Sequence, residues 1–261
     1  MSEHTFLTAT SPFDERLARL KEIISESNKI TFFGGAGVST GSGIPDFRSE
    51  NGLYNNMPEE VKQFRPEYLL SRDILFQHPE IFYKFYREHL DLRNYEPNTV
   101  HKYFAYLEEL GKMEAVVTQN VDLLHEKAGT KKLFKIHGTV STCRCEKCGA
   151  KFDMNYIFDN TDPVPRHDCK RHGLIRPDVV FYGEQLPAKE YAGAVNALHH
   201  SDCLVVCGTS LAVQPAASLV SEFEGKYLVI VNMTATDYDN YADLVFHEDM
   251  NVIFAQLLKD A

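Results

Sequence analysis

The chain has 261 residues, of which 44% are hydrophobic and 25% charged, and its formal net charge is −10 at pH 7. This length and apolar content suffice for one or two domains with a sizeable core. The acidic balance argues against a protein that binds nucleic acid or coats an anionic membrane. The sequence has no secretion-signal pattern at its start and no apolar stretch long enough to cross a bilayer, so we expect a cytoplasmic protein.

The first half of the chain alternates predicted helices and strands. Leu17, Leu20 and Ile24 recur at the spacing of one helix face, which predicts an amphipathic helix near the start. Gly111 is expected to end a later helix. In chain order, the predicted elements are a helix at 12–28, a strand at 30–33, helices within 50–97, a helix at 98–110 and strands at 113–118 and 133–136.

The second half begins with a segment of different character and then returns to short apolar strands. Residues 139–175 are rich in cysteine, proline and charge and show little periodicity. Strands that alternate with helices predict an α/β fold, a Rossmann-like parallel sheet with helices on both faces. Two inserts, one helical and one cysteine-rich, interrupt it. The later predicted strands are at 179–182, 203–207, 226–232 and 244–246.

Four of these strands end in polar or glycine-rich loops. Ligands of a parallel α/β sheet bind beyond the carboxyl ends of its strands, so we expect the four loops to meet in one crevice. Any one of them alone is better explained by an ordinary polar loop. The four sequences are GGAGVST, TQNVD, CGTS and VNMT.

The first loop indicates nucleotide binding without hydride transfer. Its small residues would let phosphates approach the backbone, and we expect a helix N-terminus after it that favours negative charge. Gly35 and Gly37 fit the dinucleotide pattern G-x-G-x-x-G, but its third glycine position holds Thr40. The chain then continues into IPDFR, without the second strand and acidic residue by which a dehydrogenase holds the ribose.

These motifs resemble those of the sirtuin family, the NAD-dependent protein-lysine deacylases. The family signatures G-A-G-[IV]-S-x-x-S-G-I-P-D-F-R and T-Q-N-[IV]-D-x-L-H are both matched, as are H-G, G-T-S-L and the family's substrate-binding strand. The matches keep the family's order and extend over nearly the whole chain, roughly residues 16–255. The matching stretches are 35–48, 118–125, 137–138, 175–187 and 208–211.

The resemblance implies a division into two domains. A Rossmann-like NAD-binding domain is expected from residues 1–49, 98–138 and 176–261. The helical insert at 50–97 and a zinc-binding insert at 139–175 are expected to form the smaller domain.

The resemblance also implies a reaction: removal of acetyl or other neutral acyl groups from lysines of acylated proteins or peptides. NAD is consumed as co-substrate, and the products are nicotinamide and O-acyl-ADP-ribose. His137 resembles the general base that activates a ribose hydroxyl, a role that suits imidazole because its pKa lies near neutrality. Asn120 and Asp122 resemble the residues that position the nicotinamide ribose and carboxamide.

The remaining binding residues follow from the same matches. Val179, Phe181 and Gly183 are expected to line the acyl-lysine tunnel and to pair with the substrate as an added strand. Thr209 and Ser210 can equally be helix N-cap residues. The expected NAD-binding residues are Gly35, Ala36, Gly37, Thr40, Asp46, Phe47, Arg48, Gln119, Val121, Gly208, Thr209, Ser210, Asn232 and Met250.

The sequence partly indicates which acyl groups the protein accepts. The branch of the family that prefers succinyl or malonyl groups binds their carboxylate with a Tyr-x-x-Arg pair. In this chain Tyr83 is followed by Tyr86 where the arginine would stand, and Arg87 comes one place late, about 100° around a helix. We therefore expect neutral acyl groups.

Four of the six cysteines crowd the second insert, which indicates metal binding rather than a disulfide framework. The resemblance implies a structural zinc held by two C-x-x-C pairs, the second of which is C-x-x-H here. His167 or Cys143 could supply the fourth ligand instead, and a metal-free loop is the alternative. The expected ligands are Cys145, Cys148, Cys169 and His172.

Two other functions remain open at this point. The same reactive ribose could be transferred to a protein nucleophile, which would make the chain a protein ADP-ribosyltransferase. Alternatively, the chain could be a non-catalytic NAD-sensing module. His137, Asn120 and Asp122 together argue against the module, because binding alone requires no base.

Overall fold

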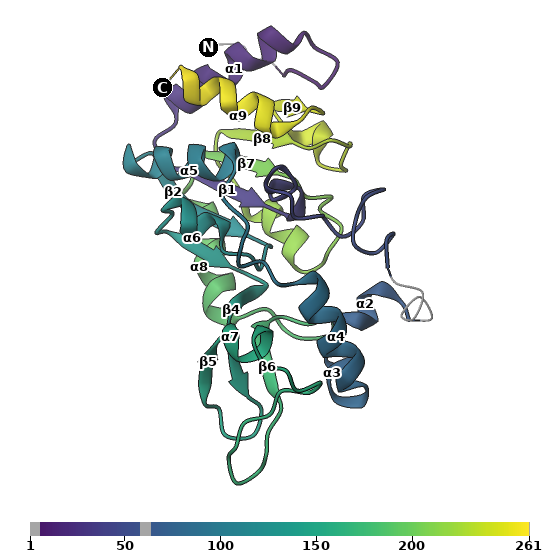
Figure 1. Cartoon of the computed structure of the whole chain (residues 1–261). Helices are drawn as coiled ribbons and strands as arrows, with labels where there is room; N and C mark the ends of the chain where they lie inside the picture. Colours follow the sequence, from purple (N-terminus) through teal and green to yellow (C-terminus); the bar gives the residue numbers. More distant parts are fainter. Residues whose placement is uncertain (1–5, 58–63, 261) are drawn as a thin grey trace.

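The computed structural model describes residues 6–57 and 64–260, and its centre is a parallel sheet of six strands in the order β3-β2-β1-β7-β8-β9 (Figure 1). Every residue of β1, β7 and β8 is buried, as expected for strands covered on both faces. The expected parallel sheet is therefore confirmed. Its strands are β1 (Ile30–Gly34), β2 (Met113–Thr118), β3 (Leu133–Lys135), β7 (Cys203–Cys207), β8 (Tyr227–Val231) and β9 (Leu244–Phe246).

Helices cover both faces of this sheet because successive strand residues point to opposite sides. Phe32 belongs to a core with α1, α5 and α9, whereas its neighbour Phe33 belongs to a core with α8 and the 3-10 helix η4. The two cores are separated by the sheet, so the molecule has three layers at this level. The bounds are α1 (Phe13–Glu26), α5 (Thr99–Glu109), α8 (Ala188–His200), α9 (Met250–Lys259) and η4 (Ala216–Glu222).

Local signals set several of these boundaries. The Asn98 side chain accepts a hydrogen bond from Val100 N at the start of α5, and Asp249 does the same for Asn251 N at the start of α9. Gly111, with a φ of 73°, follows the end of α5 as expected. None of the helices in the described ranges has both the length and the apolar character to cross a bilayer.

A second, smaller sheet has the order β5-β4-β6 and is antiparallel. It packs with four helices into a separate core, which joins Leu69 and Phe82 to Ile157 and Ile175. Residues 58–63 of the expected helical insert lie outside the described residues. The bounds are β4 (Gly138–Cys145), β5 (Lys151–Asp153), β6 (Ile175–Val179), α2 (Pro66–Leu69), α3 (Arg72–Gln77), α4 (Pro79–His89) and α7 (Asn155–Phe158).

Two expectations about local structure are wrong. The strand expected at 179–182 lies earlier in the chain, as β6, and ends at Val179. It pairs with β4 and so belongs to the antiparallel sheet, not to the main parallel sheet. The glycine-rich loop is not followed by an α-helix. Two single 3-10 turns, Ala36–Val38 and Thr40–Ser42, follow instead.

Candidate functional site

The loops after β1, β7 and β8 meet through their backbones. Gly37 N donates to Gly208 O at 2.9 Å, and Gly208 N donates to Val231 O at 3.1 Å. A Cβ atom on Gly37 would lie 2.8 Å from the Gly208 Cα, and Gly208 itself has a φ of 60°. The glycines of the first loop therefore permit contact between two strand-end loops.

The loop after β2 joins the same cluster and carries His137 with it. Gln119 N donates to Gly34 O at 2.9 Å, and Gln119 Nε2 donates to Thr209 Oγ1 at 3.0 Å. The Gln119 carbonyl lies 2.9 Å from Nδ1 of His137. The structure therefore brings the expected base to the same edge of the sheet as the glycine loop.

This contact fixes the chemical state of His137. Since a carbonyl oxygen only accepts, Nδ1 carries the proton and donates it to Gln119 O, which leaves Nε2 with a free lone pair. Burial lowers the pKa of His137, and the bond to Gln119 only partly opposes that effect. A neutral imidazole with Nε2 as acceptor is the form that can take a proton from a hydroxyl.

Asn120 and Asp122 are tied together by a residue that the sequence analysis did not single out. Ser39 Oγ donates to Asp122 Oδ2 at 2.7 Å and accepts from Asn120 Nδ2 at 3.0 Å. All three side chains are at most 8% exposed. Ser39 lies within the glycine-rich motif, and this position could have indicated its role from the sequence.

Asp122 is buried and accepts hydrogen bonds on both carboxylate oxygens. Burial raises the pKa of its carboxyl, while the bonds from Leu124 N and Ser39 Oγ lower it in part. Leu124 N donates to Oδ1 at 3.0 Å, at the start of α6 (Leu124–Ala128). The carboxylate is thus held in one orientation by fixed donors on both of its oxygens.

Asn232 clamps the loop after β7. Its Oδ1 accepts from Thr209 N at 3.0 Å, and its Nδ2 donates to Thr209 O at 2.8 Å. Thr209 Oγ1 accepts from Leu211 N at 3.2 Å, yet the next helical segment begins only at Ala216. Thr209 therefore closes a tight turn and is not a helix N-cap.

The segment IPDFR folds back on itself in a closed turn. Asp46 Oδ1 accepts from Arg48 N and Ser49 N, and Tyr54 N donates to Phe47 O at 3.0 Å. The Phe47 and Tyr54 rings lie 5.4 Å apart. Asp46 thus orders its own loop.

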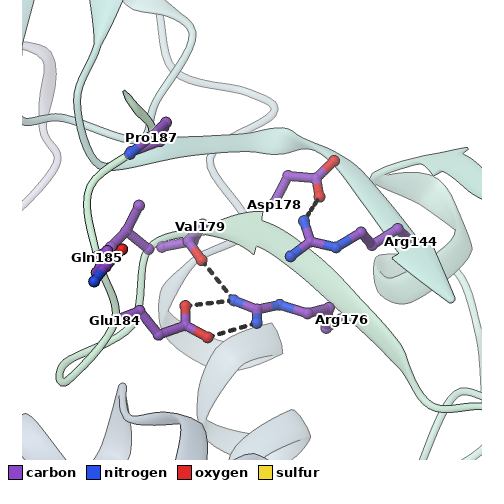
Figure 2. A pocket seen from close by; sticks show the side chains of 8 residues that line it. Arg144, Arg176, Asp178, Val179, Glu184, Gln185 and Pro187 are labelled. Carbon is purple, nitrogen blue, oxygen red and sulfur yellow. Dashed lines mark hydrogen bonds and ion pairs between the residues drawn. The ribbon is translucent and has the colours of Figure 1, made fainter. Parts of the chain in front are cut away.

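The stretch after β6 is held by an ion pair between buried Arg176 and partly exposed Glu184. Arg176 Nη1 and Nη2 donate to the two carboxylate oxygens of Glu184 at 2.7 and 2.8 Å, and Nη2 also donates to Val179 O (Figure 2). Glu184 Oε2 further accepts from Phe181 N at 3.0 Å. The expected substrate strand therefore has a rigid support.

A cleft of about 430 Å³ lies beside this support. Arg144 and Asp178, which form an ion pair, stand on its other side (Figure 2). His137 is not among the lining residues, but Val180, which is, donates its N to His137 O at 2.8 Å. The lining residues are Arg144, Arg176, Asp178, Val179, Val180, Glu184, Gln185 and Pro187.

The other expected site residues lie in or beside the same loops. Ala36 and Thr40 lie in the two 3-10 turns, and Val121 O accepts from Val140 N at the start of the small sheet. Met250 is 4% exposed and packs in the core with Val38 of the glycine loop.

A compact cluster of four metal-ligating side chains lies in the small sheet region. The ligand atoms all lie within 4.8 Å of one another, Cys148 Sγ is 3.2 Å from His167 Nδ1, and Cys145 Sγ is 3.9 Å from Cys169 Sγ. A tetrahedral zinc with Zn–S bonds of about 2.3 Å sets its sulfurs about 3.8 Å apart. The donor set Cys₃His and this spacing fit a structural zinc. The cluster consists of Cys145, Cys148, His167 and Cys169.

His172, the expected fourth ligand, does not belong to this cluster, and His167 takes its place. His172 is 71% exposed, at a φ of 43°, and its nearest charged partner is Asp168 at 3.8 Å. The chain turns between Cys169 and His172, which directs His172 away, whereas His167 lies in a backbone pairing with Gly173. Cys143, the other alternative, instead donates to Asp153 O.

Comparison with known proteins gives a consistent result. A family model described as the Sir2 family matches residues 35–215. A protein named NAD-dependent protein deacetylase from Clostridium acetobutylicum is 42% identical to this chain, and the match covers 94% of this chain and 98% of that protein. A protein of the same name from Clostridium perfringens is 44% identical, and the match covers 94% of this chain and 99% of that protein. Two solved structures also match this chain, one described as Sir2 bound to acetylated peptide and one as Sir2 with p53 peptide and NAD+. Both have a TM-score of 0.82, and their sequences are 33% and 34% identical to this chain. Each match covers 94% of this chain and 98% of the other.

Proposed function

Because this chain belongs to the Sir2 family, we propose that it removes acetyl and other neutral acyl groups from protein lysines and consumes NAD in the reaction. Nicotinamide and O-acyl-ADP-ribose are the products. Relatives that carry the name NAD-dependent protein deacetylase match it along almost their whole length. Sir2 structures that match it hold acetylated and propionylated peptides.

One observation supports this reaction above all: the hydrogen bond from His137 Nδ1 to Gln119 O, which leaves Nε2 free to act as a base. NAD supplies a ribose carbon whose nicotinamide can leave when the acyl oxygen arrives. His137 then takes the proton of a ribose hydroxyl, which makes that oxygen a nucleophile toward the acyl carbon. Its lowered pKa keeps the imidazole neutral at physiological pH.

The strand-end loops offer the polar groups that a dinucleotide requires. Asn120 and Asp122, held by Ser39, orient the nicotinamide end, and this network is fixed before any ligand arrives. Thr209 and Asn232 contact the adenosine side, and Arg48, an exposed guanidinium on the folded-back loop, faces the phosphates. The Thr209–Asn232 clamp supports the placement of the adenosine side at β7 and β8.

The preference for neutral acyl groups has support from two side chains that are already engaged. The Tyr83 hydroxyl donates to Ile175 O at 2.6 Å. The Arg87 guanidinium donates to Ile157 O and Asp162 O. The Tyr83 hydroxyl is therefore engaged, and two nitrogens of Arg87 are held by backbone carbonyls rather than presented to a carboxylate.

Cys145, Cys148, His167 and Cys169 would hold a zinc ion whose role is structural, since four protein ligands would leave no position for substrate. The domain division at 1–49, 98–138 and 176–261 against 50–97 and 139–175 has support from the separate core under the small sheet. We assign the protein to the cytoplasm, where its six free cysteines would stay reduced.

The test is a comparison of the wild type with His137→Ala on a panel of acyl-lysine peptides with NAD, read as nicotinamide release. Loss of a general base should lower turnover by about 10²- to 10⁴-fold. Binding of ADP-ribose should be retained. His199→Ala, at an exposed position of α8, is the matched control and should retain full activity.

Three outcomes distinguish the alternatives. Mass spectrometry that finds O-acyl-ADP-ribose supports the deacylase. Protein-linked ADP-ribose in place of that product would instead indicate an ADP-ribosyltransferase. A wild type as inert as His137→Ala toward every peptide, with ADP-ribose still bound, would favour the NAD-sensing module.

A further inference from the structure

The cleft beside β6 borders the segment that is expected to hold the acyl-lysine (Figure 2). Val179 and Val180 of that segment form part of its wall, and Val180 N donates to the backbone oxygen of His137. Its volume of about 430 Å³ lies in the range of ligand pockets. In a bound substrate, the side chains that flank the acyl-lysine are therefore the groups that lie close enough to enter this cleft.

Two arginines of the cleft lie opposite each other, and each has its own carboxylate. The strand register pairs Arg144 of β4 with Arg176 of β6. Like charges in such a position repel each other, and ion pairs with Asp178 and Glu184 neutralise them. The four charged side chains that line the cleft therefore balance, so the ligand is selected by hydrogen-bonding capacity and not by net charge.

The two arginines differ in the capacity that they have left. The Arg176 side chain is 5% exposed, and each of its three guanidinium nitrogens donates to a carbonyl or carboxylate oxygen. The Arg144 side chain is 40% exposed, and among the residues that the structure describes only its Nη1 has a partner, Asp178. Its Nε and Nη2 remain, and they form a planar fork that matches a carboxylate.

The carboxylates of the cleft are engaged on all four oxygens. Glu184 accepts from Arg176 on each oxygen, and Asp178 accepts from Arg144 on one oxygen and from Thr142 Oγ1 on the other. A lysine that entered the cleft would have to share these acceptors with an arginine. A carboxylate that entered it would meet the unused fork of Arg144.

A guanidinium that holds two carboxylates already occurs elsewhere in this protein. Arg93 Nε and Nη2 donate to the two oxygens of Asp91 at 2.8 and 2.7 Å, while its Nη1 donates to Asp159 Oδ1 at 2.6 Å. Arg144 shows half of this arrangement, with Nη1 bonded to Asp178 and with Nε and Nη2 available. A second carboxylate would complete it.

We propose that Arg144 is a specificity-determining residue, which binds the carboxylate of an aspartate or glutamate that lies near the acyl-lysine in the substrate. This inference rests on the proposed function and adds to it a preference for acylated segments with an acidic neighbour. The net charge of −10 would by itself favour basic segments, so an acidic preference indicates a local contact.

The experiment measures nicotinamide release from matched pairs of acetyl-lysine peptides, which carry glutamate or glutamine at each flanking position in turn. At one flanking position the glutamate peptide should have a KM about fivefold lower than its glutamine partner. The kcat values should differ less than about twofold, because the contact lies outside the reacting groups. The difference in KM should shrink as the salt concentration rises, since Arg144 is partly exposed.

Three variants test the residue itself. Arg144→Gln should give equal KM values for the two peptides, and Arg144→Lys should keep only part of the difference, because an ammonium lacks the fork. Lys151→Gln is the matched control. Lys151 lies opposite Arg144 on β5, is exposed and does not line the cleft, so its removal changes the charge equally and should leave the glutamate preference intact. Thermal unfolding of each variant checks that the fold is retained.

The inference and the proposed function fail in different ways. An active wild type that does not distinguish glutamate from glutamine at any position would overturn the inference alone. A preference that survives in Arg144→Gln, or a lower KM for lysine than for glutamine at the same position, would do so as well. A wild type that releases no nicotinamide from any acyl-lysine peptide would overturn the proposed function.

Discussion

Two further histidines show how the same residue type serves the core. His125 belongs to the motif that also carries Asn120 and Asp122, yet it is 1% exposed, and neither of its ring nitrogens has a partner among the described residues. Its ring centre lies 4.7 Å from that of His101, which is fully buried. Burial lowers the pKa of both, that of His101 to about 4. Both are therefore neutral core side chains at pH 7.

This pair makes the protein sensitive to acid. The folded pKa of His101 lies below the value of about 6.5 in the unfolded chain, so the unfolded state binds more protons as pH falls. The free energy of unfolding should fall by on the order of 3 kcal/mol between pH 6.5 and pH 4 from His101 alone. Urea unfolding at a series of pH values measures this slope.

In His101→Leu the free energy of unfolding should fall less steeply between pH 6.5 and pH 4 than in the wild type, whatever the effect of the substitution at pH 7. Equal slopes in His101→Leu and wild type would mean that His101 does not titrate as a buried neutral group.

At the scale of elements, local patterns predicted most of the main sheet. β2, β7 and β9 have the predicted bounds, because each is a short apolar run between turn signals. β6 was assigned to the wrong sheet, since its apolar sequence does not say whether β4 or a parallel neighbour will pair with it. The metal ligands show a similar limit: C-x-x-H spacing favoured His172, but the chain turns back so that His167 pairs with Gly173, and the spacing alone does not show this turn.

The cluster of metal ligands gives a direct prediction for this region. His167→Ala should lose bound zinc and unfold at lower temperature, because a structural site needs its fourth ligand. His172→Ala keeps all four ligands and should match the wild type in both respects. Metal content by mass spectrometry, together with thermal unfolding before and after chelator treatment, measures the two effects. Zinc loss in His172→Ala with retention in His167→Ala would contradict the assignment.

At the scale of the whole molecule, the site is an assembly of loops that are remote in sequence. The motifs located Gly35, Asn120 and His137 in advance, since ligands of a parallel sheet bind at one edge. The sequence could not show that Gly37 packs on Gly208, or that Ser39 joins Asn120 to Asp122, because these contacts depend on how separate loops meet.

A ligand that spans these loops should stabilise the entire fold. ADP-ribose at 100 times its dissociation constant adds about 2.7 kcal/mol to the free energy of unfolding. For a chain of this size that corresponds to a rise of about 5 to 10 °C in Tm. Asn232→Ala, which breaks the clamp on Thr209, should show a clearly smaller rise at the same ADP-ribose concentration. Scanning calorimetry gives both values, and an equal rise in the two proteins would remove Asn232 from the adenosine side.

The position of β1 also has a consequence for how the protein is made. β1 pairs on one side with β2, but its other neighbour is β7, where Ile30 lies beside Cys203. A ribosome must therefore translate beyond Cys207 before the middle strand gains its second partner. Until then the nascent chain carries an open edge on a strand whose residues are all buried in the finished fold, which makes it a substrate for chaperones during synthesis.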